Sequence, residues 1–529
     1  MSLQTFLSRE VPEETAAIGR VLFPKENVYR QIGDRFDELF PDESIFAPLY
    51  KETGRGAVSP LLLSLVTIFQ MLEKLPDRLA AEQTVSRIDW KYGLHLPLTY
   101  LGFHFTVLKD FRKRLLAHGQ ERLVFDQLLK TLVELGLIKR RGKMRTDSTH
   151  VLAVVERLSQ LELICESIRS AQQAILKVAP EWGEEALPAT FRDHYSQRQS
   201  EFGLSQSEIE KRLVKAGQDG FWLLNQVREA PQVVQELPEI DLLRQVLEQQ
   251  YPKGPGGSAS SRRPTGGDVV ESPHEPEARY SVKRGKGWIG YKIQVTETCD
   301  DDLPRLIVDL EPTSAHQNDS PEVPQIQGRL KNQQLLPGEQ HVDQGYMSGK
   351  NLVTSKEQGV DLVGVPLNDT QGPQGFQQSD FQIDMERQQA ICPEGHVSKV
   401  WSYRQIKPGE PPAIYVRFDA RTCQACPHFG LCTKSKQGRS LTLHPYRTAL
   451  LDRRSVAETP EYRVKLHLRA GVEATISELV RAHGLRQARY RGKQKLRLQA
   501  YFTALAINLK RLMRWWTQPI PSQEPVLTT

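Results

Sequence analysis

Hydrophobic residues recur at helical spacing along much of the chain, and β-branched residues gather in short runs between those stretches. Residues 1 to about 135 are predicted to be helical. One helix should begin at Ser59-Pro60, because Ser caps a helix N-terminus well and Pro fits the first helical position. Leu61, Leu65 and Ile68 continue that helix on one face. This pattern predicts an all-α N-terminal part.

Strand signals begin at Lys143 and alternate with helices from there on. The run Met144 to Val151 is rich in β-branched residues, and helical spacing returns from Val154 to Tyr251. The later elements are predicted as strands at 291–296, 306–310, 341–343 and 359–366, a helix at 325–335, and a helical stretch at 462–516. We expect these elements to form one α/β layer structure that two insertions interrupt.

Composition limits the class of protein without naming it. The chain has 529 residues, of which 39% are hydrophobic and 25% charged, as in globular proteins of several domains. Pro252 to Asp268 has 11 Pro, Gly or Ser among 17 residues and is predicted to be a linker. The apolar stretch Leu61 to Leu72 is shorter than the roughly 20 residues of a bilayer span. No secretion signal is recognisable, so a cytoplasmic location is expected.

Four of the six cysteines lie close together in the sequence. Cys423 and Cys426 form a Cys-x-x-Cys pair, Cys432 follows, and Cys392 lies 31 residues before the pair. Four thiolates suit a tetrahedral structural zinc site, with His396 and His428 as possible substitutes. Reduced structural thiols and an iron–sulfur cluster remain the alternatives. Cys165 lies on an apolar helix face and is expected in the core.

Acidic residues at the predicted strands point to metal chemistry. Asp147 lies inside one strand and Asp343 ends another, where a charge is costly unless it is paired or binds metal. Glu473 lies on a predicted helix, with Arg469 and Ser477 on the same face. Three carboxylates favour Mg²⁺ or Mn²⁺ over Zn²⁺. Any single one of these acids is equally compatible with a surface, capping or turn position.

Several segments together resemble the DDE transposases of bacterial insertion sequences. The resemblance covers about residues 20 to 515 and rests on Arg87–Tyr92, Phe111–Leu115, Arg145–Thr149, Pro276–Arg279, Gly290–Lys292, Asp343–Tyr346, Gly471–Glu473 and Gly484–Gly492. It implies an α/β, ribonuclease-H-like mixed sheet flanked by helices, with Asp147, Asp343 and Glu473 as the acidic triad. Arg469 fits the Arg that accompanies the Glu in such enzymes. Leu466 and Val480 replace the accompanying Tyr and Lys, and Arg481 is the substitute cation.

The resemblance also implies an order of domains. We expect a helical N-terminal DNA-binding or dimerisation domain at 1–140, the first catalytic strand at 141–153, a helical insertion at 154–251, a linker at 252–279, catalytic core at 280–366, a cysteine-bearing insertion at 367–450, catalytic C-terminal helices at 451–516 and a disordered tail at 517–529. Within the first domain, the helices from Ser59 and from Thr106 are expected to form a helix-turn-helix-like unit. Arg112, Lys113 and Arg114 would supply its basic face.

Basic residues concentrate near the C-terminus. The whole chain has a net charge of +6, whereas residues 461–514 alone hold 13 Lys or Arg and 3 acidic residues. Such clustering suits phosphate contacts, although a solvated helix surface is the plain alternative. The candidate DNA-binding residues are Arg481, Arg486, Arg489, Arg491, Lys493, Lys495 and Arg497, with a second group at Lys283, Arg284 and Lys286. From Leu498 to Met513 the apolar residues are expected to be core.

The resulting hypothesis is a transposase that moves its own insertion sequence. It would cut the element's ends with Mg²⁺ or Mn²⁺ and join them to target double-stranded DNA, as a homodimer on DNA near the bacterial nucleoid. One alternative is a metal-dependent DNA nuclease that never joins ends. Another is a catalytically inactive DNA-binding protein.

Overall fold

The structure is a computed structural model that describes residues 2–4, 8–40, 42–254, 264, 266–367, 372–406 and 408–517. The chain divides into two compact units. The first combines Met1–Lys139, Asp147–Gln317 and Glu473–Thr529, and the second combines Arg140–Thr146 and Asn318–Val472. Segments far apart in the sequence therefore share a unit. Most of the predicted linker, and the tail after residue 517, lie outside the described residues.

The N-terminal part of the first unit is built from helices. They are α1 (Glu13–Leu22), α2 (Val28–Asp34), α3 (Phe36–Leu39), η1 (Ser44–Leu49), α4 (Pro60–Glu73), α5 (Asp77–Ser86), α6 (Ile88–Gly93), α7 (Thr106–Ala117) and α8 (Leu123–Glu134). Helix α4 begins where the sequence predicts, because the Ser59 hydroxyl accepts a hydrogen bond from the Leu62 N–H at 3.3 Å. Its residues from Pro60 to Met71 are all buried, so α4 is a central helix of this part.

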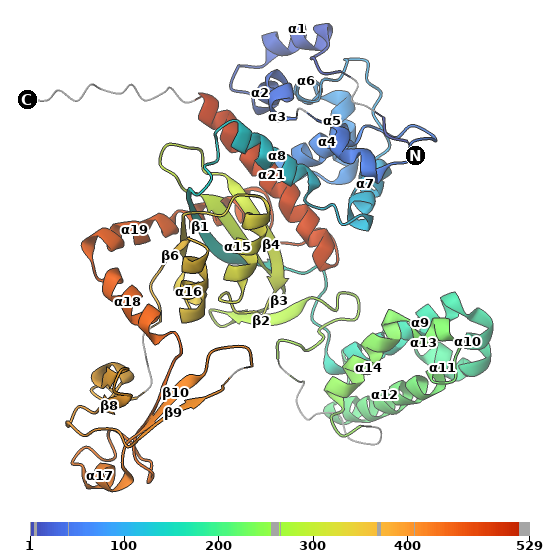
Figure 1. Ribbon diagram of the computed structural model, residues 1–529. Coiled ribbons are helices and arrows are strands. Elements are labelled where there is room, and N and C mark those ends of the chain that lie inside the picture. The colour runs from blue at the N-terminus through green and yellow to red at the C-terminus, as the bar shows by residue number, and fades with distance from the viewer. Residues whose placement is uncertain are drawn as a thin grey trace, which may run out of the picture. The chain divides into compact units, whose positions relative to one another are not determined.

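The long C-terminal helix α21 (Lys493–Thr517) belongs to the same unit and packs on these helices. Figure 1 shows α21, in red, beside α4 and α8 and next to strand β4. The Phe125 ring stacks on Tyr501 with the ring centroids 5.4 Å apart. The apolar residues from Leu498 to Met513 are buried, which confirms their prediction as core.

Three antiparallel strands and part of a fourth form the sheet of the first unit. They are β2 (Arg279–Lys283), β3 (Lys286–Thr298) and β4 (Ile307–Ser314), with β1 (Lys143–Leu152) beside β3. Gly290 in β3 has φ 151°, and a Cβ there would meet the Val151 carbonyl oxygen of β1. The close approach of the two strands explains why glycine occupies this position.

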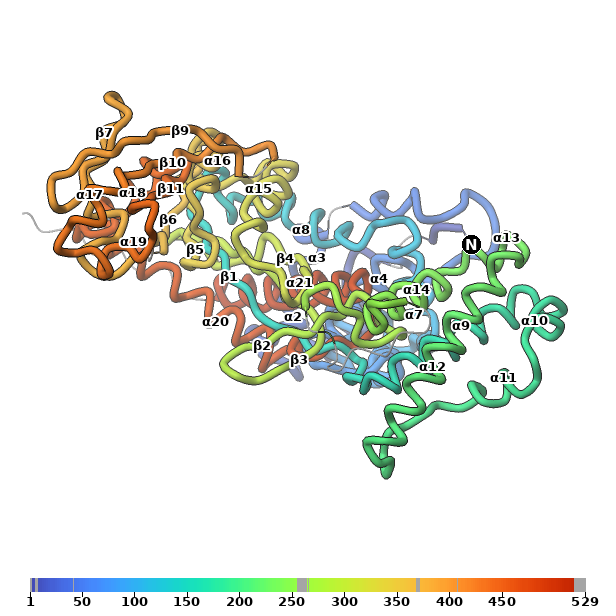
Figure 2. The backbone as a smooth tube through the Cα atoms, turned by 90° about the horizontal axis from the view of Figure 1, so that it is seen from below, coloured from blue at the N-terminus to red at the C-terminus, as the bar shows by residue number. Residues whose placement is uncertain are grey.

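The segment after β1 forms a helical bundle with its own core. Its helices are α9 (Gln160–Val178), α10 (Pro180–Ala186), α11 (Ala189–His194), α12 (Gln206–Val227), α13 (Gln232–Gln235) and α14 (Pro238–Gln250). Figure 2 shows α9, α12 and α14 next to one another, and they contact each other through Ile168, Leu223 and Leu247 among other buried residues. Cys165 is 5% exposed and belongs to this core, as predicted.

The second unit contains the parallel part of the sheet. The first residues of β1 pair with β5 (Glu339–Val342), and β5 pairs with β6 (Asp361–Val363). The accompanying helices are α15 (Glu322–Asn332), η2 (Gln344–Tyr346), α16 (Gly349–Glu357), α18 (Arg447–Ala457) and α19 (Pro460–Ala470). The whole fold is thus a mixed α/β fold with parallel and antiparallel strands.

Residues 376–443 form a small part of the second unit that we call the cysteine subdomain. It contains η3 (Gln378–Asp380), β7 (Gln382–Asp384), β8 (Gln389–Ile391), β9 (Val400–Arg404), β10 (Ala413–Arg417), α17 (Ala420–Ala425) and β11 (Ser440–Leu443). Strands β9, β10 and β11 form one antiparallel sheet, and β7 and β8 form a hairpin. This region is therefore more regular than its sequence suggests.

The helical stretch predicted at 462–516 consists of several helices with a loop between them. Helix α19 ends at Ala470, α20 (Val472–Ser477) follows Gly471, and a π-helical turn, η4 (Glu478–Ala482), leads into a loop at 483–492 before α21. The loop contains Gly484 and Gly492, both with positive φ. Left-handed backbone at two glycines cannot continue a right-handed helix, and it accounts for the interruption.

Candidate active site and DNA-binding surface

The first candidate acid follows the parallel-strand pairing directly. Thr146 of β1 pairs with Val342 of β5, and Asp147 is the residue after Thr146. Thr146 is fully buried, and its hydroxyl lies 3.0 Å from the Gln340 amide nitrogen, which donates to it. Asp147 is only partly buried and accepts a hydrogen bond from the Ser148 N–H at 2.7 Å. Asp147 is therefore the first residue of β1 after three consecutive buried ones, and its side chain is partly accessible.

The second candidate acid occupies the end of the partner strand. Asp343 follows Val342, is exposed, and caps the short turn η2 by accepting from the Gln344 N–H at 2.7 Å. The turn is anchored by Tyr346, whose side chain is buried and whose carbonyl oxygen accepts from the Asn351 amide at 2.8 Å. The sequence predicted a strand through Asp343, whereas β5 ends one residue earlier.

The third candidate acid lies on α20. Glu473 is exposed, and the neighbouring Val472 is fully buried. Two residues later, the Thr475 hydroxyl donates to the buried carboxylate of Glu297 at 2.5 Å, and Arg511 donates to the same carboxylate at 2.9 Å. These contacts hold α20 against β3 and α21 within the first unit. The Glu473 side chain stays exposed.

The predicted single helical face through Arg469, Glu473 and Ser477 is wrong in one respect. Gly471 separates α19 from α20, so Arg469 ends one helix and Glu473 begins the next. A Cβ at Gly471 would collide with the guanidinium of Arg145, which is 3% exposed and donates to the Leu468 carbonyl at 2.9 Å. The glycine of the Gly-Val-Glu motif is thus required by close packing.

The loop at 483–492 shows which of the predicted basic residues have partners inside the protein. Arg486 donates to the His150 carbonyl, Arg489 to the Leu75 carbonyl, and Arg497 forms an ion pair with Glu311. The other predicted residues of this group are more accessible: Arg481, Arg491 and Lys495 are exposed, and Lys493 is partly exposed. Arg486, Arg489 and Arg497 therefore have structural roles within the protein.

Two carboxylates hold the start of α21. Glu275 accepts from the Gly492 N–H at 2.9 Å, and Glu277 accepts from the Lys493 N–H at 3.0 Å. Carboxylates are favourable at a helix N-terminus because they satisfy free N–H groups and complement the helix dipole. The sequence interpretation missed this role, although the Pro276–Arg279 motif marks the segment.

The second predicted basic group forms the tip of a tight hairpin. Lys283 and Lys286 are paired residues at the ends of β2 and β3, and Arg284 and Gly285 form the turn with φ 53° and 77°. Positive φ at both central residues is typical of a type I′ hairpin turn. Lys283, Arg284 and Lys286 are all exposed, which agrees with the exposed hairpin weighed from the sequence.

A histidine lies between the two basic groups. His150 of β1 packs against Trp288 with ring centroids 5.1 Å apart. Burial lowers the pKa of His150 to about 4, and the positive charges of Arg486 and Lys283 act in the same direction. His150 is therefore neutral at physiological pH, and basic residues from both predicted groups lie within electrostatic reach of it.

The predicted basic face of α7 is wrong. Arg112 is 6% exposed and forms an ion pair with Asp77. The Arg114 guanidinium donates to the Leu49 carbonyl at 3.0 Å and covers the Tyr50 ring. Only Lys113 of the three is exposed. Helices α5 and α6 also stand between α4 and α7 in the chain, so the two predicted helices are not joined by a single turn.

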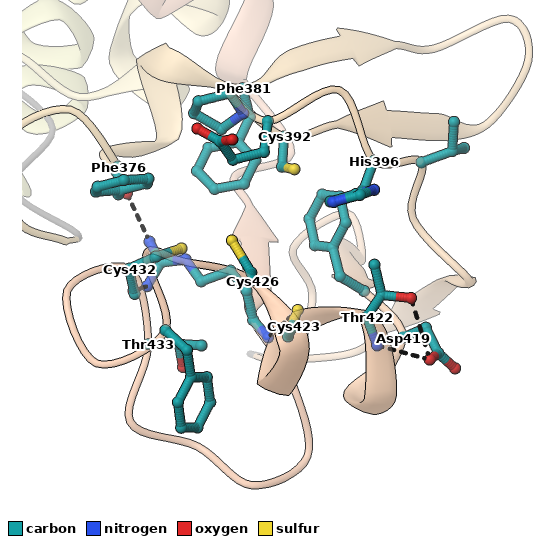
Figure 3. A pocket seen from close by; sticks show the side chains of 16 residues that line it. Phe376, Phe381, Cys392, His396, Asp419, Thr422, Cys423, Cys426, Cys432 and Thr433 are labelled. Carbon is teal, nitrogen blue, oxygen red and sulfur yellow. Dashed lines mark hydrogen bonds between the residues drawn. The ribbon is translucent and has the colours of Figure 1, made fainter.

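The cysteine subdomain brings its four cysteines to one small cavity of about 40 Å³. Cys392, Cys423, Cys426 and Cys432 line it, and Figure 3 shows their sulfur atoms on different sides of the shared space. All four are free thiols. Burial and the proximity of the other three cysteines raise the pKa of the Cys432 thiol.

Among the described residues, no group of three or more His, Cys, Asp or Glu side chains is already arranged as a metal site. No helix in the described ranges is long and apolar enough to cross a membrane.

Two family models match the chain. One, described as a transposase DDE domain, matches residues 391–513, and the other, described as a transposase domain, matches residues 19–114. The first match includes Arg469, Glu473 and the four clustered cysteines, whereas Asp147 and Asp343 lie outside both. No curated protein and no solved structure matches the chain. The two matches agree with the resemblance carried by the sequence motifs: these two parts of the chain are similar to transposase domains, one of them a DDE domain.

Proposed function

We propose that the protein cuts DNA at the ends of its own insertion sequence and joins those ends to target DNA. Water adds to the phosphorus at each end, and the bond from phosphorus to the 3′ oxygen breaks, leaving a 3′-hydroxyl and a 5′-phosphate. That hydroxyl then attacks a target phosphodiester, forms the new bond and releases a target 3′-hydroxyl. Both steps are phosphoryl transfers that depend on positioning and charge neutralisation.

One observation carries this proposal. Asp147 and Asp343 are the residues that follow the paired positions Thr146 and Val342 on neighbouring parallel strands. Asp147 lies inside β1 directly after its last pair with β5, and Asp343 follows the last residue of β5. Like charges in this register repel each other, and a bound divalent cation would remove that repulsion. The same register supports, as part of the proposal, a ribonuclease-H-like core for the sheet.

Asp147, Asp343 and Glu473 would hold the divalent cations, and their donor chemistry fits Mg²⁺ or Mn²⁺ because all are carboxylate oxygens. Bound ions would supply an activated water and would stabilise charge on the phosphate. Arg469 would bind a phosphate near Glu473, and Arg481 would take the place of the lysine that this sequence lacks. Asp343 keeps its carboxylate in place through the Gln344 N–H.

The DNA partner is double-stranded, both at the element's ends and at the target, and a homodimer on DNA at the bacterial nucleoid is proposed as the acting species. The exposed residues Arg481, Arg491 and Lys495, with the hairpin tip at 283–286, are the proposed phosphate contacts. A chain that only cuts DNA would lack the joining step, and an inactive DNA-binding chain would lack both.

The test uses labelled element ends, supercoiled target DNA and Mg²⁺, with cleavage and joining measured separately. Asp343→Asn should lower both by at least about a thousandfold, since a lost ligand removes electrostatic stabilisation of the transition state. DNA binding, measured by mobility shift, should change less than threefold. Asp241→Asn, an exposed acid of α14, is the matched control and should keep both activities.

Three results would contradict the proposal or part of it. Cleavage without joining would support the nuclease alternative. Binding with neither activity in the unaltered protein would support the inactive alternative. Full activity of Asp343→Asn would exclude Asp343 from the site.

A further inference from the structure

The cysteine subdomain has a small apolar core. Its core cluster consists of seven buried residues, namely Phe381, Ala390, Ile414, Val416, Phe418, Leu441 and Leu443. Segments of this size usually need an additional cross-link such as a disulfide or a metal ion. Cys392, Cys423 and Cys432 pack directly on the edge of this core. A cross-link between these thiols would therefore connect separate parts of the subdomain at the edge of its core.

Backbone turns present the cysteines to the cavity. At the first turn, the Cys392 N–H donates to the His396 carbonyl at 2.9 Å, and the Gly395 N–H donates to the Cys392 carbonyl at 2.8 Å. Gly395 has φ 82°, a conformation that suits glycine and closes the turn. The chain therefore folds tightly around Cys392 and directs it from the end of β8.

The second turn carries the other three cysteines. Cys423 lies in α17, and the Cys426 N–H donates back to its carbonyl at 3.2 Å. The Cys432 N–H donates to the His428 carbonyl at 2.9 Å, which returns the chain to the cavity. The Arg439 backbone N–H donates to the Cys423 sulfur at 3.5 Å. Such N–H to sulfur hydrogen bonds favour a sulfur that carries negative charge.

We propose that Cys392, Cys423, Cys426 and Cys432 bind one structural zinc ion as thiolates. The cavity of about 40 Å³ is larger than the roughly 10–15 Å³ that one water molecule needs. It therefore has room for a single ion. Thiolates select Zn²⁺ over the hard cations proposed for the carboxylates. Because the described side chains do not already form a metal site, the thiols turn about their Cα–Cβ bonds to reach tetrahedral Zn–S distances of about 2.3 Å.

The two histidines named as substitutes differ in their surroundings. The His428 Nε2 lies 3.2 Å from a Glu394 carboxylate oxygen, and the ring packs on Phe376. This ring nitrogen therefore already has a partner. His396 also lines the cavity, but the four cysteines there complete a tetrahedral ligand set without it. The four-thiolate set is therefore favoured. Its net charge of −2 with zinc is offset in part by Arg439, which also lines the cavity.

Zinc content is the direct test, and it does not depend on transposition. The full-length chain, purified without chelators, should contain about one zinc per chain by mass spectrometry and no iron. Titration of the native protein with an organomercurial, followed by a zinc-sensitive dye, should release that zinc as four thiols react. Cys426→Ser should lose most of the zinc, and the controls Cys299→Ala and His428→Ala should retain it.

The thiol titration keeps the proposal testable if Cys426→Ser does not fold. Four thiols that react in the native protein without zinc release would overturn the proposal. Disulfides among these cysteines would do so as well, and bound iron with sulfide would replace zinc by an iron–sulfur cluster. If Cys426→Ser retained zinc and His396→Ala lost it, His396 would be a ligand in place of Cys426. That result would overturn the four-thiolate set.

Discussion

At the residue scale, accessible charged side chains and those with partners inside the protein have different roles. Asp147 is partly exposed, and Asp343 and Glu473 are exposed, so none of the three carboxylates is shut off from solvent. The partner of each arginine could not be inferred, because Arg112 and Arg497 bond to acids distant in sequence. Charge alone does not distinguish a DNA contact from an internal ion pair.

Gly471 illustrates a residue whose role only packing reveals, and it gives a stability prediction. In Gly471→Ala the new methyl group meets the Arg145 guanidinium, which must move away from the Leu468 carbonyl. The free energy of unfolding should fall by about 1–3 kcal/mol, measured by urea denaturation.

The matched control for Gly471, whose backbone is right-handed, is a helical glycine of the same unit. Gly328→Ala in α15 places its methyl group in open space and should be neutral or stabilise by up to about 1 kcal/mol. Equal effects of the two substitutions would show that helix propensity, and not the contact with Arg145, governs the position.

At the scale of elements, periodicity predicts long helices well and their interruptions poorly. The start of α4 and the core face of α21 are confirmed. The break at Gly471 and the loop at 483–492 were missed, since short helices and the basic loop share one continuous pattern of polar and apolar residues. The strands of the cysteine subdomain were also weakly signalled, because they are only three to five residues long.

The attachment of α21 to its neighbours gives the second stability prediction. Arg511 of α21 donates to Glu297 of β3 and to Glu478 of η4, both at 2.9 Å, and Glu297 is fully buried. Arg511→Ala removes the positive charge from this buried group and should lower the free energy of unfolding by about 3 kcal/mol. Denaturant unfolding followed by circular dichroism measures it.

Arg514→Ala is the control, because Arg514 is an exposed residue of the same helix. Its effect should stay within about 0.5 kcal/mol. If Glu297→Gln in the Arg511→Ala background restores no stability, the ion pair is not the source of the loss.

At the scale of the molecule, the N-terminal helices are not a detachable module. Within the first unit, Met71 and Leu75 accept hydrogen bonds from His483 and Arg489, and Arg35 covers the Trp516 ring. Removing residues 1–140 would expose the buried side of α21. Recognition of the element's ends by this region, expected from the sequence, is therefore better tested with surface substitutions. The sequence could not show this, because the contacts join residues more than 400 positions apart.

The charge distribution over the molecule leads to the last prediction, which concerns DNA affinity. The hairpin tip at 283–286 is exposed and carries three positive charges next to the strand that holds Asp147. Lys283→Ala, Arg284→Asn and Lys286→Ala together remove those charges, and Asn suits the positive φ of Arg284. If each residue contacts a phosphate, the slope of log affinity against log salt should become shallower by about 2 to 3, equally for element ends and random DNA.

A second triple variant separates local contact from general charge. Lys211→Ala, Arg212→Ala and Lys215→Ala remove three exposed charges from α12 in the helical bundle, whose surface is not a proposed DNA contact. Fluorescence anisotropy over a range of salt concentrations should give this variant the slope of the unaltered protein. If both triples weaken binding equally, net charge explains the affinity. A loss confined to element ends would instead mean that the hairpin reads base sequence, because phosphate contacts are blind to it.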